Sequence, residues 1–215
     1  MHLLVMAKEP VAGRVKTRLC PPCTAAEAAD LAGAALADTL EAVAACGADR
    51  RVIALEGRPG PWLPDGFEVV PQQGASLGER LDAAWAEVGG PGIQIGMDTP
   101  QVGADLLDHA LARLADGASC LLGDAVDGGW WAIGLQRAVP RLFGPVPTSR
   151  HDTGARQRAR CRALGLAVES LPVRRDVDEA ADAVEVALEA PDSRFAAKVR
   201  ALGALGRWDD EAVIA

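Results

Sequence analysis

The stretch LLVMAKEPVAGRVKTRL, residues 3–19, places a basic loop directly after a short apolar run. Its first five residues have the length and composition of a buried strand. The next twelve carry four cations and a single acid, in a chain whose formal net charge is −8. The four cations are Lys8, Arg14, Lys16 and Arg18. Because open α/β sheets bind ligands at the carboxyl ends of their strands, we expect this loop to bind phosphate oxygens, the alternative being a solvated charged loop.

Strand and helix patterns alternate along the rest of the chain. Capping-box spacing at Thr24 with Glu27, and at Ser76 with Glu79, predicts helices over 24–46 and from 76 to about 88. Further helices are predicted around the apolar stripe of 107–114 and at 151–164, 179–190 and 193–206. Further strands are predicted at 51–55, 67–70, 92–96, 119–123, 130–135 and 166–171. The alternation predicts an α/β sheet with helices on its faces, in one domain spanning residues 1–215.

The amino-acid composition argues against several classes of protein. The chain has 215 residues with 30 acidic and 22 basic side chains, and this balance argues against a nucleic-acid or membrane-surface binder. No uncharged stretch exceeds ten residues, which is too short for a membrane-spanning helix. Five cysteines without an N-terminal export signal predict a reduced, cytoplasmic protein.

Three acidic turns follow predicted strands. They are Asp98 in IGMDTP, Asp124 and Asp127 in GDAVDGGWW, and Asp176 and Asp178 in RRDVDEA. Taken singly, each aspartate is more typical of a helix cap or a turn. A divalent cation bound together with phosphates needs only one or two carboxylates and several waters. The three turns and the basic loop together therefore predict a metal-bridged di- or triphosphate.

Five motifs occur in order over nearly the whole of residues 3–190: KEPVAGRVKTRL, PQQGASLGERLDAAW, IGMDTP, GDAVDGGWWAIGL and RDVDEAADA. Together they resemble the bacterial glycosyltransferase-like proteins of the type associated with radical-SAM enzymes and arsenosugar biosynthesis, compact relatives of the nucleotide-diphospho-sugar transferases. The resemblance implies the GT-A fold, a Rossmann-like three-layer α/β/α sandwich with a mostly parallel mixed sheet. The chain departs from the usual motifs at Met97, Trp130 and Glu179, where the family has Ser, Tyr and Thr.

The resemblance also implies roles for particular residues. Lys8, Lys16 and Arg18 would bind phosphates. Residues near the nucleoside would be Gln73, Gly74, Leu77, Gly78 and Arg80. Asp98 would hold Mg²⁺ or Mn²⁺, and Asp127 and Asp178 would supply a second metal ligand or the base that deprotonates an acceptor hydroxyl.

The activity implied is sugar transfer from a nucleoside-diphosphate sugar to a small acceptor with a divalent metal. The acidic charge balance predicts no nucleic-acid or membrane partner, and a homodimer is left open. Two alternatives stay open: a guanylyl- or cytidylyltransferase that releases pyrophosphate, and a non-catalytic nucleotide-binding protein. The CPPC pair Cys20 and Cys23 has no second CxxC or nearby His, so we expect no redox or zinc role. Trp130 and Trp131 must point to opposite faces of a strand, leaving one free to stack on a ligand. His151 is either an acceptor contact or a solvated loop residue.

Overall fold

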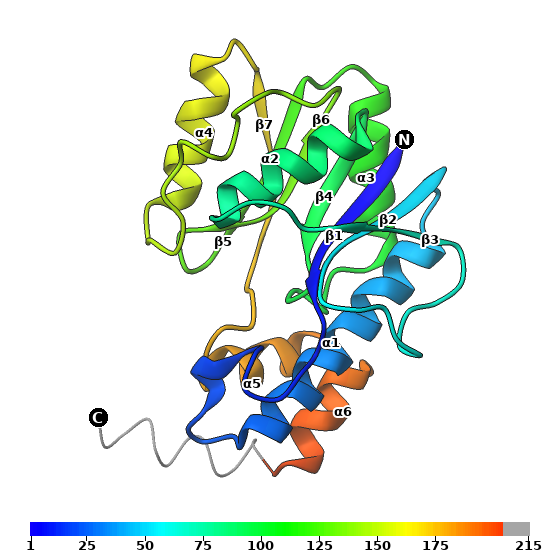
Figure 1. The fold of residues 1–215 in the computed structure, drawn as a ribbon, viewed down its shortest axis with the longest axis vertical. Helices are drawn as coiled ribbons and strands as arrows, with labels where there is room; N and C mark the ends of the chain where they lie inside the picture. Colours follow the sequence, from blue (N-terminus) through cyan, green and yellow to red (C-terminus); the bar gives the residue numbers. More distant parts are fainter. Residues whose placement is uncertain (204–215) are drawn as a thin grey trace.

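The computed structural model describes residues 1–203, and within them seven strands form one mixed sheet (Figure 1). The strand order is β3-β2-β1-β4-β6-β5-β7. β6 pairs antiparallel with both β4 and β5, and every other neighbouring pair is parallel. The strands are β1 His2–Lys8, β2 Arg50–Glu56, β3 Phe67–Pro71, β4 Gly92–Gly96, β5 Cys120–Ala125, β6 Trp130–Leu135 and β7 Val168–Arg174.

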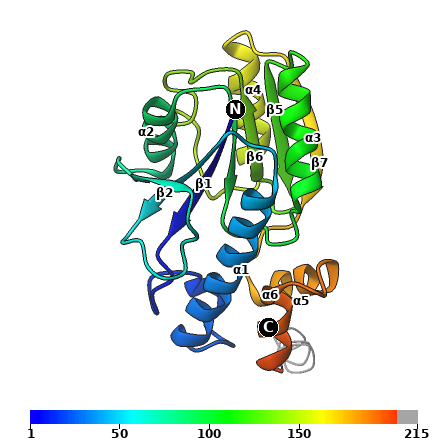
Figure 2. The same cartoon turned by 90° about the vertical axis from the view of Figure 1, so that its right-hand side faces the viewer.

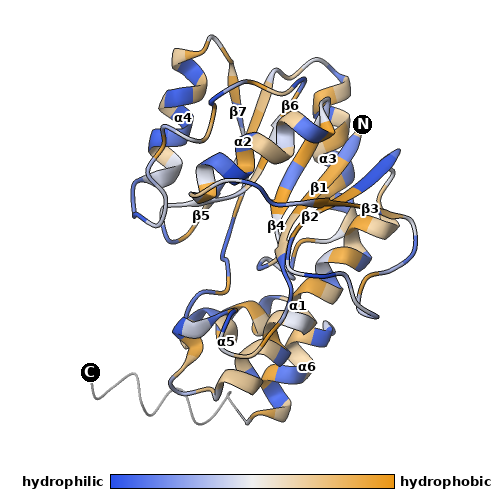
Figure 3. Cartoon of the chain, viewed as in Figure 1, coloured by the Kyte–Doolittle hydropathy of each residue, from blue (hydrophilic) through white to orange (hydrophobic). Residues whose placement is uncertain are grey.

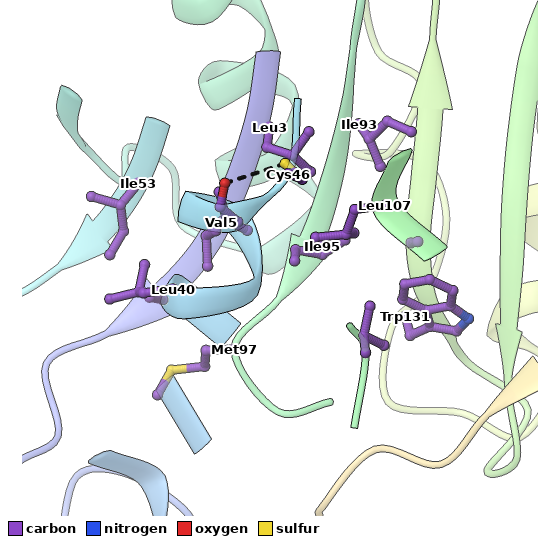
Figure 4. Packing of buried hydrophobic residues seen from close by; sticks show 14 of the residues in the cluster. Leu3, Val5, Leu40, Cys46, Ile53, Ile93, Ile95, Met97, Leu107 and Trp131 are labelled. Carbon is purple, nitrogen blue, oxygen red and sulfur yellow. Dashed lines mark hydrogen bonds between the residues drawn. The ribbon is translucent and has the colours of Figure 1, made fainter. Parts of the chain in front are cut away.

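Helices cover both faces of the sheet, as Figure 2 shows from the side. The helices are η1 Thr17–Leu19, α1 Ala25–Ala45, α2 Leu77–Val88, α3 Ala104–Ala115, α4 Thr153–Ala163, α5 Ala180–Glu189 and α6 Arg194–Ala201. Apolar side chains of α1 and α3 pack on one face, against alternate strand residues such as Val5 and Ile95 (Figure 4). Those of α2 and α4 pack on the other face, against Leu4 and Ile133. The predicted three-layer α/β fold with a mostly parallel mixed sheet is confirmed.

The sequence signals for helix starts act as expected at α1 and in part at α2. Thr24 and Glu27 form the complete capping box, in which each side chain bonds the other residue's backbone N–H. The Ser76 hydroxyl accepts from the Glu79 N–H, but the Glu79 carboxylate accepts instead from the N–H of Ala75. Both arrangements satisfy backbone donors that the first helical turn leaves without partners.

A third apolar cluster lies beyond the carboxyl edge of the sheet (Figure 1). The 21 residues of α1 make a helix about 31 Å long, so its first half extends past the strands. That half packs against α5 and α6, with Leu31 and Phe195 fully buried in the contact.

Most predicted boundaries differ from the structure by one or two residues, and β7, α4 and α6 are three of the elements affected. β7 begins at Val168 and not at residue 166, because Gly165 adopts a positive φ of 79° and the Leu166 N–H still bonds the Cys161 carbonyl at the end of α4. α4 itself begins at Thr153. α6 ends at Ala201, and residues 204–206 of the predicted helix lie outside the described residues. The single domain over 1–215 stays a prediction. No helix within residues 1–203 is long and apolar enough to cross a bilayer.

Candidate active site

A cavity of about 830 Å³ lies at the carboxyl edge of the sheet. Beyond β1 itself, the segments that line it come from six places in the chain: the loop after β1, the segment from the end of β3 into α2, the end of β4, the β5–β6 hairpin, residues 148–153 and the segment after β7. The residues of the predicted basic loop, acidic turns and nucleoside site that line it are Lys8, Arg14, Lys16, Arg18, Leu77, Arg80, Asp98, Asp127, Asp176 and Asp178. The fold thus brings the basic loop and the acidic turns to one cavity.

Lys16 joins the basic loop to two of the acidic turns. Its Nζ lies 2.9 Å from Asp98 Oδ2 and 3.2 Å from Asp178 Oδ1, and its side chain is 14% exposed. Burial by itself would lower the pKa of the Lys16 ammonium, but the facing carboxylates of Asp98 and Asp178 more than offset it and raise that pKa. Lys16 is therefore held charged within the cavity.

The backbone at Lys16 is in the left-handed region, with φ 45° and ψ 40°. A residue with a side chain pays of order 1 kcal/mol or more to sit there. Lys16 is the N-cap residue of the short helix η1. Arg18 lies within this helix, and its Nη1 is 3.0 Å from Asp178 Oδ2. Two cations eight and ten residues after β1 thus converge on one carboxylate.

Asp98, Asp176 and Asp178 form a compact acidic group. One carboxylate oxygen from each lies within 4.8 Å of those of the other two. Burial, followed by the negative charges of Asp98, Asp127 and Asp178, raises the pKa of Asp176 to about 7. Hard oxygen donors of this kind suit Mg²⁺ or a similar divalent cation, so the residues fit the predicted metal.

The segment after β7 is fixed by contacts to the turn after β4. The Val177 N–H donates to the Asp98 carbonyl at 2.9 Å, and the Val177 side chain is buried among α1, α5 and α6. Because side chains alternate along an extended chain, burying Val177 turns Asp176 and Asp178 together toward the cavity. Glu179 lies at the N-cap of α5 and is exposed, and its N–H donates to Asp182 at 2.9 Å.

The residues predicted near the nucleoside divide into two groups. Arg80 and Leu77 line the cavity, and Arg80 pairs with Glu56, which also lies 3.4 Å from the Lys8 ammonium. Gln73, Gly74 and Gly78 are not among the lining residues. A Cβ on Gly78 would lie 2.8 Å from the Phe143 carbonyl, so this glycine serves the packing of α2 on the loop after β6.

The β5–β6 hairpin separates its two aspartates. Asp127 lines the cavity and accepts from the Gly129 N–H at 2.7 Å, whereas Asp124 pairs with Arg158 of α4 at 2.6 Å. Trp131 is buried in the α1–α3 layer, and Trp130 lies on the opposite side, with its ring centroid 5.8 Å from that of Phe143. Both tryptophans border the cavity, as does His151.

Sequence reasoning placed Asp176 in an acidic turn but gave it no individual role, although its i, i+2 spacing to Asp178 in an extended segment was a usable signal. It did not single out Gln72. Gln72 lines the cavity, and its Nε2 donates to the carbonyls of Ala7 and Ala54 at 2.9 Å each. Cys20 and Cys23 are not lining residues, and Cys23 is buried in the third cluster.

One protein family matches more than half of the chain. A family described as "Uncharacterized protein conserved in bacteria (DUF2064)" matches residues 28–150, a span that includes Asp98 and Asp127 but not Lys16 or Asp178. No curated protein shows significant sequence similarity to the chain.

Solved structures match over most of the chain. A "putative nucleotide-diphospho-sugar transferase" from Desulfovibrio desulfuricans G20 is 27% identical over 95% of both chains, with a TM-score of 0.84. A nucleotidyl transferase from Methanothermobacter thermautotroptrophicus is 16% identical over 86% of this chain and 95% of its own, with a TM-score of 0.55. A CMP:2-keto-3-deoxy-manno-octonic acid synthetase complexed with CTP is 12% identical over 88% and 98%, with a TM-score of 0.53. The last two share the fold.

Proposed function

We propose that this chain, which belongs to the DUF2064 family of bacterial proteins, transfers a sugar from a nucleoside-diphosphate sugar to a small acceptor. The observation that carries the proposal is the convergence of Lys16, Asp98 and Asp178 in a cavity lined by the basic loop. Such a cavity offers cations to a diphosphate and carboxylates to a divalent metal or an acceptor hydroxyl. The likeness to the Desulfovibrio desulfuricans G20 protein supports the same class of substrate.

The basic loop would receive the diphosphate. Lys8, Lys16 and Arg18 border the same cavity, and each cation can donate charge-assisted hydrogen bonds to phosphate oxygens. As the sugar leaves, negative charge accumulates on the diphosphate, and fixed cations in a partly buried site stabilise that charge. Lys16 keeps its proton at the pH of reaction because its pKa is raised.

Asp98, Asp176 and Asp178 would hold a divalent ion, Mg²⁺ or Mn²⁺. When bound, such an ion neutralises charge on the diphosphate and orients it. Asp127 lies on the hairpin beside Trp130, where it would accept the proton of the acceptor hydroxyl, with Asp178 as the second candidate base. Gln72, Leu77 and Arg80 border the part of the cavity nearest α2 and would contact the nucleoside.

The proposal extends to association with radical-SAM and arsenosugar chemistry, as the sequence resemblance implies. It also includes the single domain and the cytoplasmic location expected from the sequence itself, and the ability to form a homodimer. Two rival functions predict different products. Nucleotidyl transfer releases pyrophosphate from a nucleoside triphosphate, sugar transfer releases a nucleoside diphosphate, and a non-catalytic binding protein releases neither.

The test pairs two variants with a panel of nucleoside diphosphates and the matching nucleosides. Asp98→Asn is isosteric and should abolish the Mn²⁺-dependent rise in melting temperature that a nucleoside diphosphate gives. Lys16→Ala should weaken binding of the nucleoside diphosphate roughly ten- to a hundredfold, because a hydrogen bond to a charged group contributes about 1.5–3 kcal/mol. The nucleoside, which lacks phosphates, should bind wild type and Lys16→Ala equally.

Asp65→Asn is the matched control, because Asp65 is exposed and does not line the cavity. Unchanged Mn²⁺-dependent binding in a folded Asp98→Asn variant would refute the metal assignment. Equal weakening of nucleoside and diphosphate by Lys16→Ala would show that the loop supports folding and not phosphate binding.

A further inference from the structure

The acidic group that would hold a metal ion is bonded to cations of the basic loop. Lys16 Nζ donates to Asp98 Oδ2 at 2.9 Å and to Asp178 Oδ1 at 3.2 Å. Arg18 bonds to the other oxygen of Asp178, with its Nη1 3.0 Å from Oδ2. Asp178 lies in the segment between β7 and α5, which is largely hydrophilic in Figure 3. Two of the three proposed metal ligands are therefore paired with cations in this structure.

The two cations differ in their exposure to solvent. The Lys16 side chain is 14% exposed, whereas that of Arg18 is 61% exposed. An exposed ion pair such as that of Arg18 contributes little to stability. A charge that is largely buried is costly to leave without a partner. Lys16 therefore needs a second anion before it can leave the two carboxylates, and Arg18 does not.

The Lys16 ammonium competes with a divalent cation for these carboxylates. Mg²⁺ and Mn²⁺ bind through carboxylate oxygens, and Lys16 bonds to such oxygens on Asp98 and Asp178. Two cations held by the same carboxylates repel each other, and more strongly in a partly buried site than in water. The Val177 N–H bonds to the Asp98 carbonyl at 2.9 Å and so holds the two acidic turns together. The flexible side chain of Lys16 is therefore the part best able to move.

We propose that Lys16 is a displaceable counterion: it leaves the carboxylates when a divalent ion binds, and it pairs with the diphosphate instead. The inference rests on the proposed function and describes how its two ligands depend on each other. Without a diphosphate, Lys16 would give up its carboxylates to a metal and gain no anion in return. Without a metal, a diphosphate would compete with Asp98 and Asp178 for Lys16. Each ligand should therefore bind poorly alone.

Binding of the two ligands should consequently be coupled through one side chain. When both bind, the carboxylates pair with the metal and Lys16 pairs with phosphate oxygens, so each of these charges has a partner. Linkage requires that the diphosphate tighten metal binding by the same factor by which the metal tightens diphosphate binding. A diphosphate also ligates a metal directly, so this coupling by itself does not identify the part played by Lys16. The distinguishing quantity is the affinity for the metal alone.

Mn²⁺ titrations without nucleotide, followed by electron paramagnetic resonance, measure that affinity. Lys16→Met nearly keeps the length of the side chain and removes its charge, so this variant should bind Mn²⁺ roughly tenfold or more tightly than wild type. Lys16→Arg keeps a cation and should bind Mn²⁺ no more tightly than wild type. Arg14→Met is the matched control, because Arg14 is an exposed cation of the same loop that lines the cavity and has no ion pair with the acidic group in residues 1–203. This control should change the affinity by about twofold at most.

Acetylation of wild type tests the displacement directly, whether or not Lys16→Met folds. The chain has three lysines, and Lys198, which is paired with Asp30 at 2.9 Å, serves as the reference. Saturating Mn²⁺ should speed acetylation of Lys16 relative to Lys198, and a nucleoside diphosphate added with it should slow that acetylation again. Equal Mn²⁺ affinity in wild type and Lys16→Met, or acetylation of Lys16 that Mn²⁺ leaves unchanged, would overturn the inference alone. No Mn²⁺ binding to any of these proteins would overturn the metal assignment of the proposed function as well.

Discussion

Replacing Asp176 with Asn should stabilise the ligand-free protein, and the gain should grow with pH. Burial and three neighbouring carboxylates raise the pKa of Asp176 to about 7 in the folded protein, from an ordinary value of 3.8. Between these two pH values the folded state holds a proton that the unfolded state has released. The free energy of unfolding therefore falls as pH rises from about 4 to 7, and it falls no further above the pKa that Asp176 has in the folded protein.

The size of the effect follows from that pKa difference. Each pH unit corresponds to about 1.4 kcal/mol, so the difference between about 7 and 3.8 sets an upper bound of about 4 kcal/mol. Solvent reaches part of the Asp176 side chain, and ions screen the neighbouring charges. We therefore expect the charged Asp176 to lower the free energy of unfolding by about 2 kcal/mol. The amide of the Asp176→Asn variant has no charge to desolvate or repel, so this variant should recover that free energy at pH 8.

Urea unfolding followed by tryptophan fluorescence measures the gain. About 2 kcal/mol corresponds to a midpoint shift of about 1 M at a slope of about 2 kcal/mol per M. Asp65→Asn, at an exposed aspartate, should shift the midpoint little at either pH. A gain for Asp176→Asn that is the same at pH 5 and pH 8, or absent at pH 8, would refute the reasoning.

Saturating Mn²⁺ should reverse the order of stability. Wild type would gain the free energy of metal binding, while Asp176→Asn lacks one of the three carboxylates that would hold the ion. The same residue would thus lower the stability of the empty site and raise that of the loaded one, a trade-off common at functional sites.

Two further predictions concern the surroundings of the cavity. Gly78→Ala should lower the free energy of unfolding, measured in urea, by about 1–3 kcal/mol, because the added Cβ would lie 2.8 Å from the Phe143 carbonyl. Gly33→Ala is the control and should be neutral or stabilising, because its Cβ would have no contact closer than 3.7 Å. Equal effects at both sites would contradict this prediction. Replacing both Cys20 and Cys23 with Ser should leave nucleoside-diphosphate binding near wild type by calorimetry, since neither lines the cavity, and a large loss would restore a role for the CPPC pair.

The elements of this fold are largely determined by local sequence. Apolar runs such as residues 3–7 become strands because a strand covered on both faces must be apolar throughout. Helices begin where Thr24 and Ser76 can accept from backbone N–H groups, which is a property of neighbouring residues. The order of the strands in the sheet, by contrast, is not determined by local sequence. Placing β6 between β4 and β5 depends on hydrogen bonds between distant segments, and only the assembled sheet decides it.

The same division holds for the site. Sequence reasoning selected the basic loop, Asp98 and Asp178, because strand-end loops meet at one edge of an α/β sheet whatever the details of packing. It did not predict that Lys16 would lie between Asp98 and Asp178, which are 82 and 162 residues away along the chain. Nor did it assign Asp176, whose raised pKa arises from burial and from the charges of three other aspartates. Contacts of this range depend on how the helices and sheet pack, because Coulomb and desolvation energies are set by distance in space and not by distance in sequence.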